Sequence, residues 1–211
     1  MSGFASLRTR PARGQMLPLM ASIIALLVIG ALFFFNIAMF ESNGRNVTEN
    51  AMRSSSLAVI GEVDESVAYE RWRIDPVAGM ALGRDLVDEN LLGNSLISNA
   101  TYQNLFASPL GSILASSTGT NGGASAGLDI EIINPAEIAG QESQSYLNDP
   151  NVNGAVPCSS GVYPQPVESQ ITGDCYDHPT VIMRARLPVT QITGGSTLVT
   201  EVVVISMGTD V

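Results

Sequence analysis

The chain has 211 residues, of which 45% are apolar and only 14% are charged, against about 25% charged in an ordinary soluble domain. Its formal net charge is −10 and all ten cations are arginines, so we expect no nucleic-acid surface, which needs clustered Lys or Arg on one face. Two cysteines and one histidine exclude a disulfide-dense miniprotein or a four-cysteine zinc module and disfavour histidine-dependent catalysis. We therefore expect no cofactor and no metal.

An uncharged run covers residues 17–40, LPLMASIIALLVIGALFFFNIAMF. As a helix it would be about 36 Å long, enough to cross a hydrocarbon core of about 30 Å. Arg8, Arg10 and Arg13 precede the run and every carboxylate follows it, which places residues 1–14 in the cytoplasm and the rest across the membrane. The apolar core exceeds the roughly 7 to 15 residues of a cleavable secretory signal. The sequence therefore predicts a transmembrane helix over 15–40.

The junction Arg13-Gly14-Gln15 joins the basic leader to this apolar run. A leader that ends in Gly before a polar residue and an apolar helix resembles a prepilin-type signal. In such proteins a membrane peptidase cuts after the Gly on the cytoplasmic side and leaves the helix on the mature chain. Gly lets a protease approach the backbone closely, and the arginines hold the bond at the membrane face. An uncleaved signal anchor with a chance Arg-Gly-Gln is the alternative.

The stretch from Arg13 to Phe40, followed by RNVTENAMRSSSLAVIGE, resembles the amino-terminal region of TadE/TadG-like proteins. These are minor pilins, or pseudopilins, of tight-adherence (Flp) type IV pilus systems, and the resemblance covers about residues 13 to 65. The chain departs from the family by placing Arg53 and three serines where Ala and Asp are usual. Leu19 also replaces the Glu with which major pilins dock on a neighbouring subunit. The resemblance therefore implies a minor component rather than the main filament subunit.

Beyond the membrane, apolar residues at three- and four-residue spacings predict an amphipathic stalk helix over 41–75, ended by Pro76. Asn43-Gly44 is expected to loosen its joint with the membrane helix, because Gly costs about 1 kcal/mol in a helix interior. The apolar positions that carry the pattern are Met52, Val59, Ile60, Val63 and Val67.

Residues 76–211 are expected to form an extracytoplasmic α+β head with a small antiparallel sheet. The Ser- and Gly-rich residues 116–127 predict a flexible loop, and 128–135 predict a half-buried strand that stops at Pro135. Two strand-like runs in 180–208, with a turn near Gly194-Gly195, predict a carboxy-terminal antiparallel pair. The first run places Arg184 and Arg186 on one face.

Cys158 and Cys175 enclose a Pro-, Gly- and Ser-rich segment on the oxidising side of the membrane, which favours a disulfide. In the chain-entropy model such a loop contributes about 3 kcal/mol. The alternative is a metal or redox site that uses Cys175, Asp177 and His178 with Cys158 as a distant ligand. Residues 148–154 have the composition of a calcium loop without its spacing, which favours a turn.

The sequence as a whole predicts a minor pilin-like subunit in the bacterial inner membrane that takes part in pilus assembly or surface adhesion. Its partners would be a prepilin peptidase, other pilin subunits and pilus assembly proteins, and we expect no enzymatic activity. The first rival is an unprocessed, signal-anchored extracytoplasmic binding or adhesion protein. The second is a membrane-tethered hydrolase with His178 as base, which lacks a recognisable nucleophile.

Overall fold

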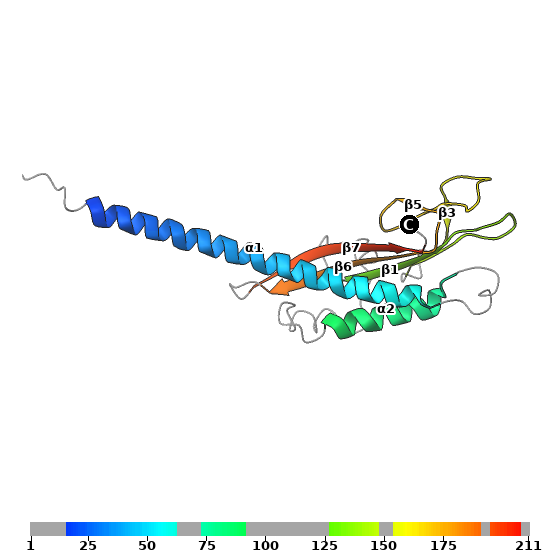
Figure 1. The fold of residues 1–211 in the computed structure, drawn as a ribbon, viewed down its shortest axis with the longest axis horizontal. Helices are drawn as coiled ribbons and strands as arrows, with labels where there is room; N and C mark the ends of the chain where they lie inside the picture. Colours follow the sequence, from blue (N-terminus) through cyan, green and yellow to red (C-terminus); the bar gives the residue numbers. More distant parts are fainter. Residues whose placement is uncertain (1–15, 63–72, 92–126, 148–153, 191–194, 208–211) are drawn as a thin grey trace, which may run out of the picture. The chain divides into compact units, whose positions relative to one another are not determined.

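The computed structural model describes residues 16–62, 73–91, 127–147, 154–190 and 195–207. The chain divides into two compact units, Met1–Met39 and Phe40–Val211. Both helices and a four-stranded antiparallel sheet are present, which confirms the α+β class (Figure 1). The elements are α1 (Met16–Ile60), α2 (Pro76–Leu91), β1 (Gly127–Asn134), β2 (Gln144–Leu147), β3 (Val156–Pro157), β4 (Val167–Glu168), β5 (Cys175–Tyr176), β6 (Thr180–Thr190) and β7 (Ser196–Ser206).

The main sheet has the strand order β2-β1-β6-β7, and every neighbouring pair is antiparallel. The expected carboxy-terminal pair is confirmed, because β6 and β7 pair without interruption from Thr180↔Ser206 to Thr190↔Ser196. The turn between them, including Gly194, lies outside the described residues. Strands β3, β4 and β5 form a second, smaller sheet.

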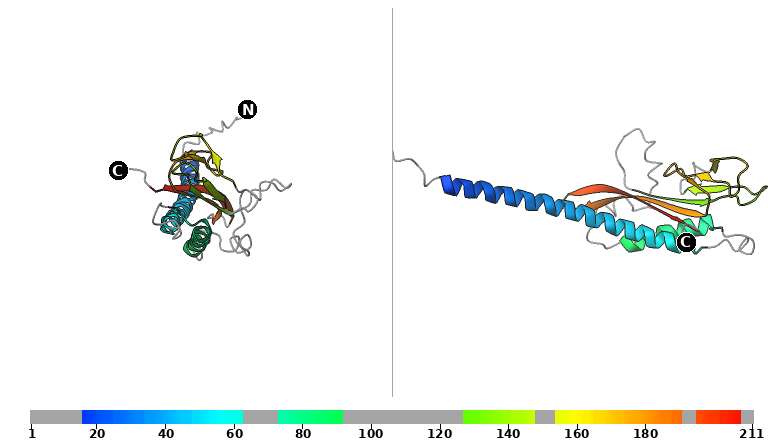
Figure 2. Two further views of the ribbon diagram at one scale, coloured as in Figure 1. Left: turned by 90° about the vertical axis from the view of Figure 1, so that its right-hand side faces the viewer. Right: turned by 45° about the horizontal axis from the view of Figure 1, so that its top comes forward.

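Within the second unit, the main sheet lies between the helices on one face and residues 154–176 on the other (Figure 2). We call residues 154–176 the disulfide segment. Because side chains alternate across a strand, one face of β1, β6 and β7 supplies the core against α1 and α2. The buried apolar residues of this core are Ala51, Met52, Val59, Ile74, Val87, Leu91, Leu128, Ile130, Ile132, Val181, Met183, Ala185, Leu187, Val189, Val199 and Val203.

Helix α1 ends at Ile60, so the expectation of one stalk helix to residue 75 is wrong. Backbone bonds from Gly61 N to Ala58 O and from Glu62 N to Val59 O close its last turn. The predicted apolar positions Met52 and Val59 are buried, whereas Val63 and Val67 lie outside the described residues.

Pro76 begins helix α2 instead of ending a helix. The Asp75 carboxylate accepts hydrogen bonds from the backbone N–H groups of Val77 (2.8 Å) and Ala78 (3.0 Å). This is an N-cap with proline at the first helical position, where a missing N–H costs nothing. Helix α2 was not predicted from the sequence, and the loop expected at 116–127 lies almost wholly outside the described residues.

Gly44 is helical and buried, so it does not loosen α1 as expected. A Cβ built on Gly44 would lie 2.5 Å from Cγ1 of Val189 in β6. Gly79 and Gly83 likewise lie within contact distance of the side chain of Val59 on α1. These glycines therefore permit close packing between elements.

Candidate functional site

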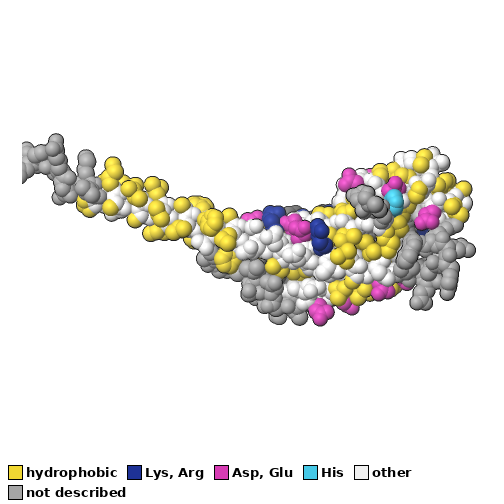
Figure 3. Space-filling model, in the orientation of Figure 1, with side chains coloured by type: hydrophobic (Ala, Val, Ile, Leu, Met, Phe, Trp, Pro, Cys, Tyr) yellow, Lys and Arg dark blue, Asp and Glu magenta, His cyan; other side chains and the backbone are white. Residues whose placement is uncertain are grey.

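The first candidate is the apolar part of α1, because it is the feature that carries the membrane prediction. Its large side chains are exposed from Leu19 (63%) to Met39 (50%). Its most apolar window has a mean hydropathy of 2.7 and no buried part. In the described part of the chain, one helix, near the amino terminus, is therefore long and apolar enough to span a membrane (Figure 3).

The polar side chains of this run bond within the helix itself. Ser22 Oγ donates to Pro18 O at 2.8 Å, and Asn36 Nδ2 donates to Leu32 O at 2.7 Å. Such bonds back to the preceding turn lower the cost of carrying these groups in hydrocarbon. The expected cleavage junction Arg13-Gly14-Gln15 lies outside the described residues, immediately before α1 begins at Met16.

The second candidate is the disulfide segment. Cys158 and Cys175 form the expected disulfide, with Cα atoms 6.3 Å apart. Their sulfurs are therefore joined to each other and do not present two thiolates to a metal. Within the described residues, no group of three His, Cys, Asp or Glu side chains could hold a metal ion.

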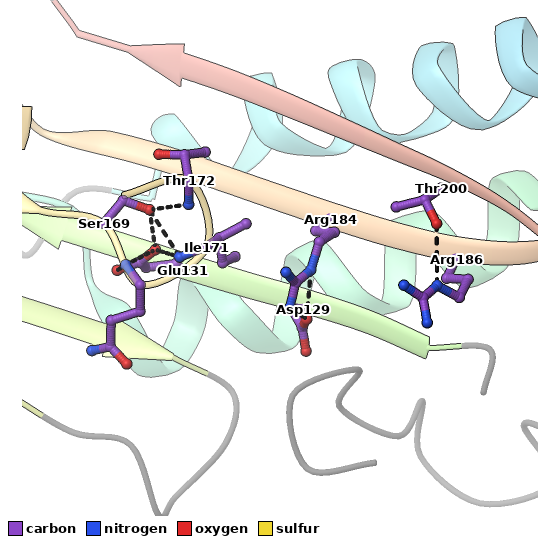
Figure 4. A network of polar contacts seen from close by, with 9 residues as sticks. Asp129, Glu131, Ser169, Ile171, Thr172, Arg184, Arg186 and Thr200 are labelled. Carbon is purple, nitrogen blue, oxygen red and sulfur yellow. Dashed lines mark hydrogen bonds and ion pairs between the residues drawn. The ribbon is translucent and has the colours of Figure 1, made fainter. Parts of the chain in front are cut away.

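A buried carboxylate fastens this segment to the sheet. Glu131 on β1 is fully buried and accepts hydrogen bonds from the hydroxyls of Ser145 (2.8 Å) and Ser169 (2.6 Å). The backbone N–H groups of Gln170 and Ile171 donate to the same carboxylate at 3.0 to 3.2 Å. Figure 4 shows this carboxylate inside the turn that carries Ser169, Ile171 and Thr172.

Because the donors come from β2 and from the disulfide segment, one side chain ties three parts of the chain together. A buried charge is tolerated only where its hydrogen bonds are made, and here both oxygens accept them. The turn closes with a bond from Gly173 N to Ser169 O at 2.9 Å, and Gly173 has φ of +77°, which favours glycine. The segment is thus held at a second place besides its disulfide.

Two residues further back on β1, Asp129 forms an ion pair with Arg184 on β6. Asp129 is fully buried, and Arg184 Nε donates to its Oδ2 at 3.0 Å. Arg186, on the same face of β6, donates from Nε to the hydroxyl of Thr200 at 3.1 Å. The predicted common face of Arg184 and Arg186 is confirmed (Figure 4).

The sequence did not reveal the carboxylates opposite these arginines. Strand β1 was expected to be half-buried, but all eight of its residues are buried, so that expectation is wrong. The helices cover one face of β1, and the disulfide segment meets the other face around Ile133. Acidic residues at alternate positions looked like a solvated face, and nothing local in the sequence marks Ser145 and Ser169 as their hydrogen-bond donors.

His178 and Asp177 lie together at the surface. His178 Nδ1 and Asp177 Oδ1 are 2.7 Å apart, with side chains 42% and 59% exposed. The hydrogen bond with His178 lowers the pKa of Asp177. Within the described residues, the His178 ring contacts a carboxylate and not a hydroxyl nucleophile.

Comparisons of the chain with protein-family models, with curated proteins and with solved structures give no match. Function is therefore inferred from the residues of the chain itself.

Proposed function

We propose that the protein is a TadE/TadG-like minor pilin of a tight-adherence (Flp) pilus, processed by a prepilin peptidase. The observation that carries the proposal is the order of features at the amino terminus. The basic leader ends in Arg13-Gly14-Gln15, and the helix that follows at once begins at Met16 and exposes apolar side chains. A cut after Gly14 would remove the leader on the cytoplasmic side and keep the whole apolar helix.

The helix would then perform two tasks in succession. In the inner membrane its exposed apolar side chains face lipid, where they are stable. In an assembly the same side chains would pack against neighbouring helices, so that leaving lipid costs little. Leu19 stands where major pilins carry the docking Glu, which supports a minor subunit.

Residues beyond the membrane would act as an extracytoplasmic head that binds other pilus components or a surface, without catalysing a reaction. Cys158–Cys175 and the buried Glu131 contacts support this role, because they hold the disulfide segment in one conformation. A preorganised segment loses less conformational entropy when it binds a partner.

The deciding experiment is to determine the intact mass and amino-terminal sequence of the chain purified from host membranes, with and without the prepilin peptidase. We expect a chain that begins at Gln15 only when the peptidase is present. Gly14→Ala should block the cut, whereas Gly3→Ala, a matched leader variant, should be cut normally.

A chain that keeps residues 1–14 in both strains would contradict the proposal. The protein would then be an unprocessed, signal-anchored extracytoplasmic binding or adhesion protein. A Gly14→Ala chain that is still cut and assembled would also remove the strongest support for the pilin route.

A further inference from the structure

The apolar run of α1 contains two polar side chains, Ser22 and Asn36, and both lie on one face of the helix. They are fourteen residues apart in the sequence. This separation is two heptads, which is four full turns in a helix that winds around a partner at 3.5 residues per turn. In a straight helix the same separation leaves the two side chains only about 40° apart around the axis. Residues 17–40 contain no other polar side chain, so all the polar groups of the run share this face.

The residues between these two complete a pattern typical of paired helices. Ser22, Ala25, Ile29, Leu32 and Asn36 follow one another at alternating spacings of three and four residues. We call these five residues the Asn36 face. All five belong to one continuous helix in the first unit, and all are exposed. Small Ala25 would allow a neighbouring helix to approach closely.

Asn36 carries hydrogen-bonding groups that its own helix does not satisfy. An asparagine amide has two N–H donors and a carbonyl oxygen that accepts. One N–H of Asn36 donates to Leu32 O at 2.7 Å, and within the described residues the other N–H and the oxygen have no partner. Ser22 differs, because its single hydroxyl donor is already used on Pro18 O. Asn36 is therefore the group that needs a partner outside its own helix.

In a membrane, water could not supply this partner. Asn36 lies about 11 Å along the helix axis from the middle of the apolar run, within the roughly 15 Å half-thickness of a hydrocarbon core. Its bond to Leu32, one turn nearer the amino terminus, directs the amide towards the middle of the run and away from the outer headgroups. Because an unpaired polar group is costly in hydrocarbon, we expect a polar group on a neighbouring helix at this depth.

Charge complementarity identifies a second copy of the chain as the source of that group. The N–H hydrogens of the Asn36 amide carry partial positive charge and its oxygen carries partial negative charge, so two such amides can bond reciprocally. The leader residues Arg8, Arg10 and Arg13 would hold every amino terminus in the cytoplasm, so all copies cross the membrane in the same direction. Parallel copies carry Asn36 at the same depth, and a two-fold axis brings the same face of each helix together.

We propose that two copies of this chain pair in the membrane through the Asn36 faces of their α1 helices, in parallel, with reciprocal hydrogen bonds between the two Asn36 amides. A buried asparagine in a parallel helix pair fixes the register, because a shifted pair leaves both amides unpaired. The inference rests on the membrane anchoring and orientation in the proposed function, and it does not depend on leader cleavage.

The test is disulfide cross-linking of the full-length chain in membranes of a bacterial host that lacks prepilin peptidase. Ala25→Cys places a thiol on the Asn36 face, and Leu27→Cys places one on the opposite face at nearly the same depth. The two native cysteines are already joined to each other, so each variant has one free thiol. After treatment with a membrane-permeable oxidant, we expect cross-linked dimers of the Ala25→Cys chain and few of the Leu27→Cys chain.

A second substitution in the Ala25→Cys chain tests the amide itself. Asn36→Leu should lower the yield of dimer about 3- to 30-fold at low expression, the range expected for the loss of one polar contact between membrane helices. Phe34→Leu, on the opposite face, is the matched control and should leave the yield unchanged. Asn36→Gln keeps an amide at the same position and should retain most of the dimer.

Equal dimer yields from Ala25→Cys and Leu27→Cys, or an undiminished yield in Asn36→Leu, would overturn the proposal. Cross-links that join the Ala25→Cys chain only to other proteins would exclude a second copy as the partner and would also overturn it. An alkaline carbonate wash separates this failure from failure of the proposed function. A chain that the wash extracts contradicts the membrane anchoring as well, whereas a retained chain without dimers contradicts the pairing alone.

Discussion

At the scale of single residues, the buried carboxylate of Glu131 is the most constrained group in the described structure. Its two oxygens accept bonds from two serine hydroxyls and two backbone N–H groups, of which only the N–H of Ile171 has a further acceptor, Ser169 Oγ, at 3.1 Å. An acidic side chain is therefore required here for its acceptors, although it lies in the interior of a sheet. Removing one acceptor would leave buried donors unpaired.

Glu131→Gln should lower the free energy of unfolding by about 2 to 3 kcal/mol. Whichever way the amide is turned, its NH₂ group faces the N–H of Gln170, so a buried donor meets another donor. The measurement is urea unfolding of the full chain in detergent, followed by circular dichroism. Glu142→Gln, on an exposed carboxylate beside β2, should change stability by less than about 0.5 kcal/mol. Equal effects of the two variants would contradict the assignment of Glu131 as a structural acceptor.

Ser56→Ala should raise stability by about 1 kcal/mol. The hydroxyl of Ser56 on α1 is buried and has no hydrogen-bond partner in the described part of the chain. Losing it removes an unsatisfied polar group and also gains a few tenths of a kcal/mol of helix propensity. Ser54→Ala is the control, because Ser54 is exposed and already bonds to Ala51 O, so it gains propensity alone. Urea unfolding measures the free energy of unfolding of both variants. A Ser56→Ala chain that is less stable than the unmodified chain would mean that the Ser56 hydroxyl has a hydrogen-bond partner.

The residue scale also marks the limit of what the sequence predicts. Periodicity located β1, β6 and β7, because alternation and flanking Pro or Gly are local signals. Burial of Asp129 and Glu131 depends on which distant segments cover β1, and the donor residues Ser169 and Gln170 lie almost forty positions away. The disulfide was predictable because the chain has only two cysteines, which allow one intramolecular pairing, and because the sequence predicts that they lie on an oxidising side of the membrane.

At the scale of elements, the ends of helices were the weakest prediction. The apolar spacing around Met52 and Val59 correctly identified a helix, but Pro76 was taken as its terminator. Proline is disfavoured inside a helix and favoured at its first position, so the same residue fits either end. Asp75, directly before it, was the signal for a helix start, since its carboxylate caps Val77 and Ala78.

Gly44→Ala distinguishes a flexible joint from a packing contact between α1 and β6. If Gly44 only loosened the helix, alanine would stabilise the chain by about 1 kcal/mol. The added Cβ would instead lie 2.5 and 2.7 Å from the two γ-carbons of Val189 and 3.2 Å from its Cβ, a stiff side chain that cannot move aside. We expect a net loss of about 1 to 3 kcal/mol in urea unfolding. Asn43→Ala, on the exposed neighbouring residue, should be neutral or slightly stabilising.

At the scale of the whole molecule, one chain carries two kinds of apolar surface. In the second unit α1 buries apolar side chains such as Met52 and Val59, although Leu57 is 57% exposed. In the first unit large apolar side chains such as Leu26 (73%) and Phe34 (73%) are exposed. In water, the exposed apolar side chains of the first unit would have no favourable environment. A hydrocarbon layer about 30 Å thick, in contrast, matches the length of this apolar run.

Val28→Asp tests this division between two environments. Val28 lies near the middle of the uncharged run, where a carboxylate costs about 2.5 to 3.5 kcal/mol on membrane insertion. The expected result is a loss of full-length chain from the membrane pellet after an alkaline carbonate wash. Val77→Asp adds the same charge at a 75% exposed site of α2, outside the run, and should leave membrane retention unchanged.

If Val28→Asp were retained in the membrane pellet as well as the control, contact with lipid would not be what keeps α1 in the membrane fraction. Its exposed side chains would then have to be covered by another protein, because an apolar surface of this length is stable in water only when it is buried.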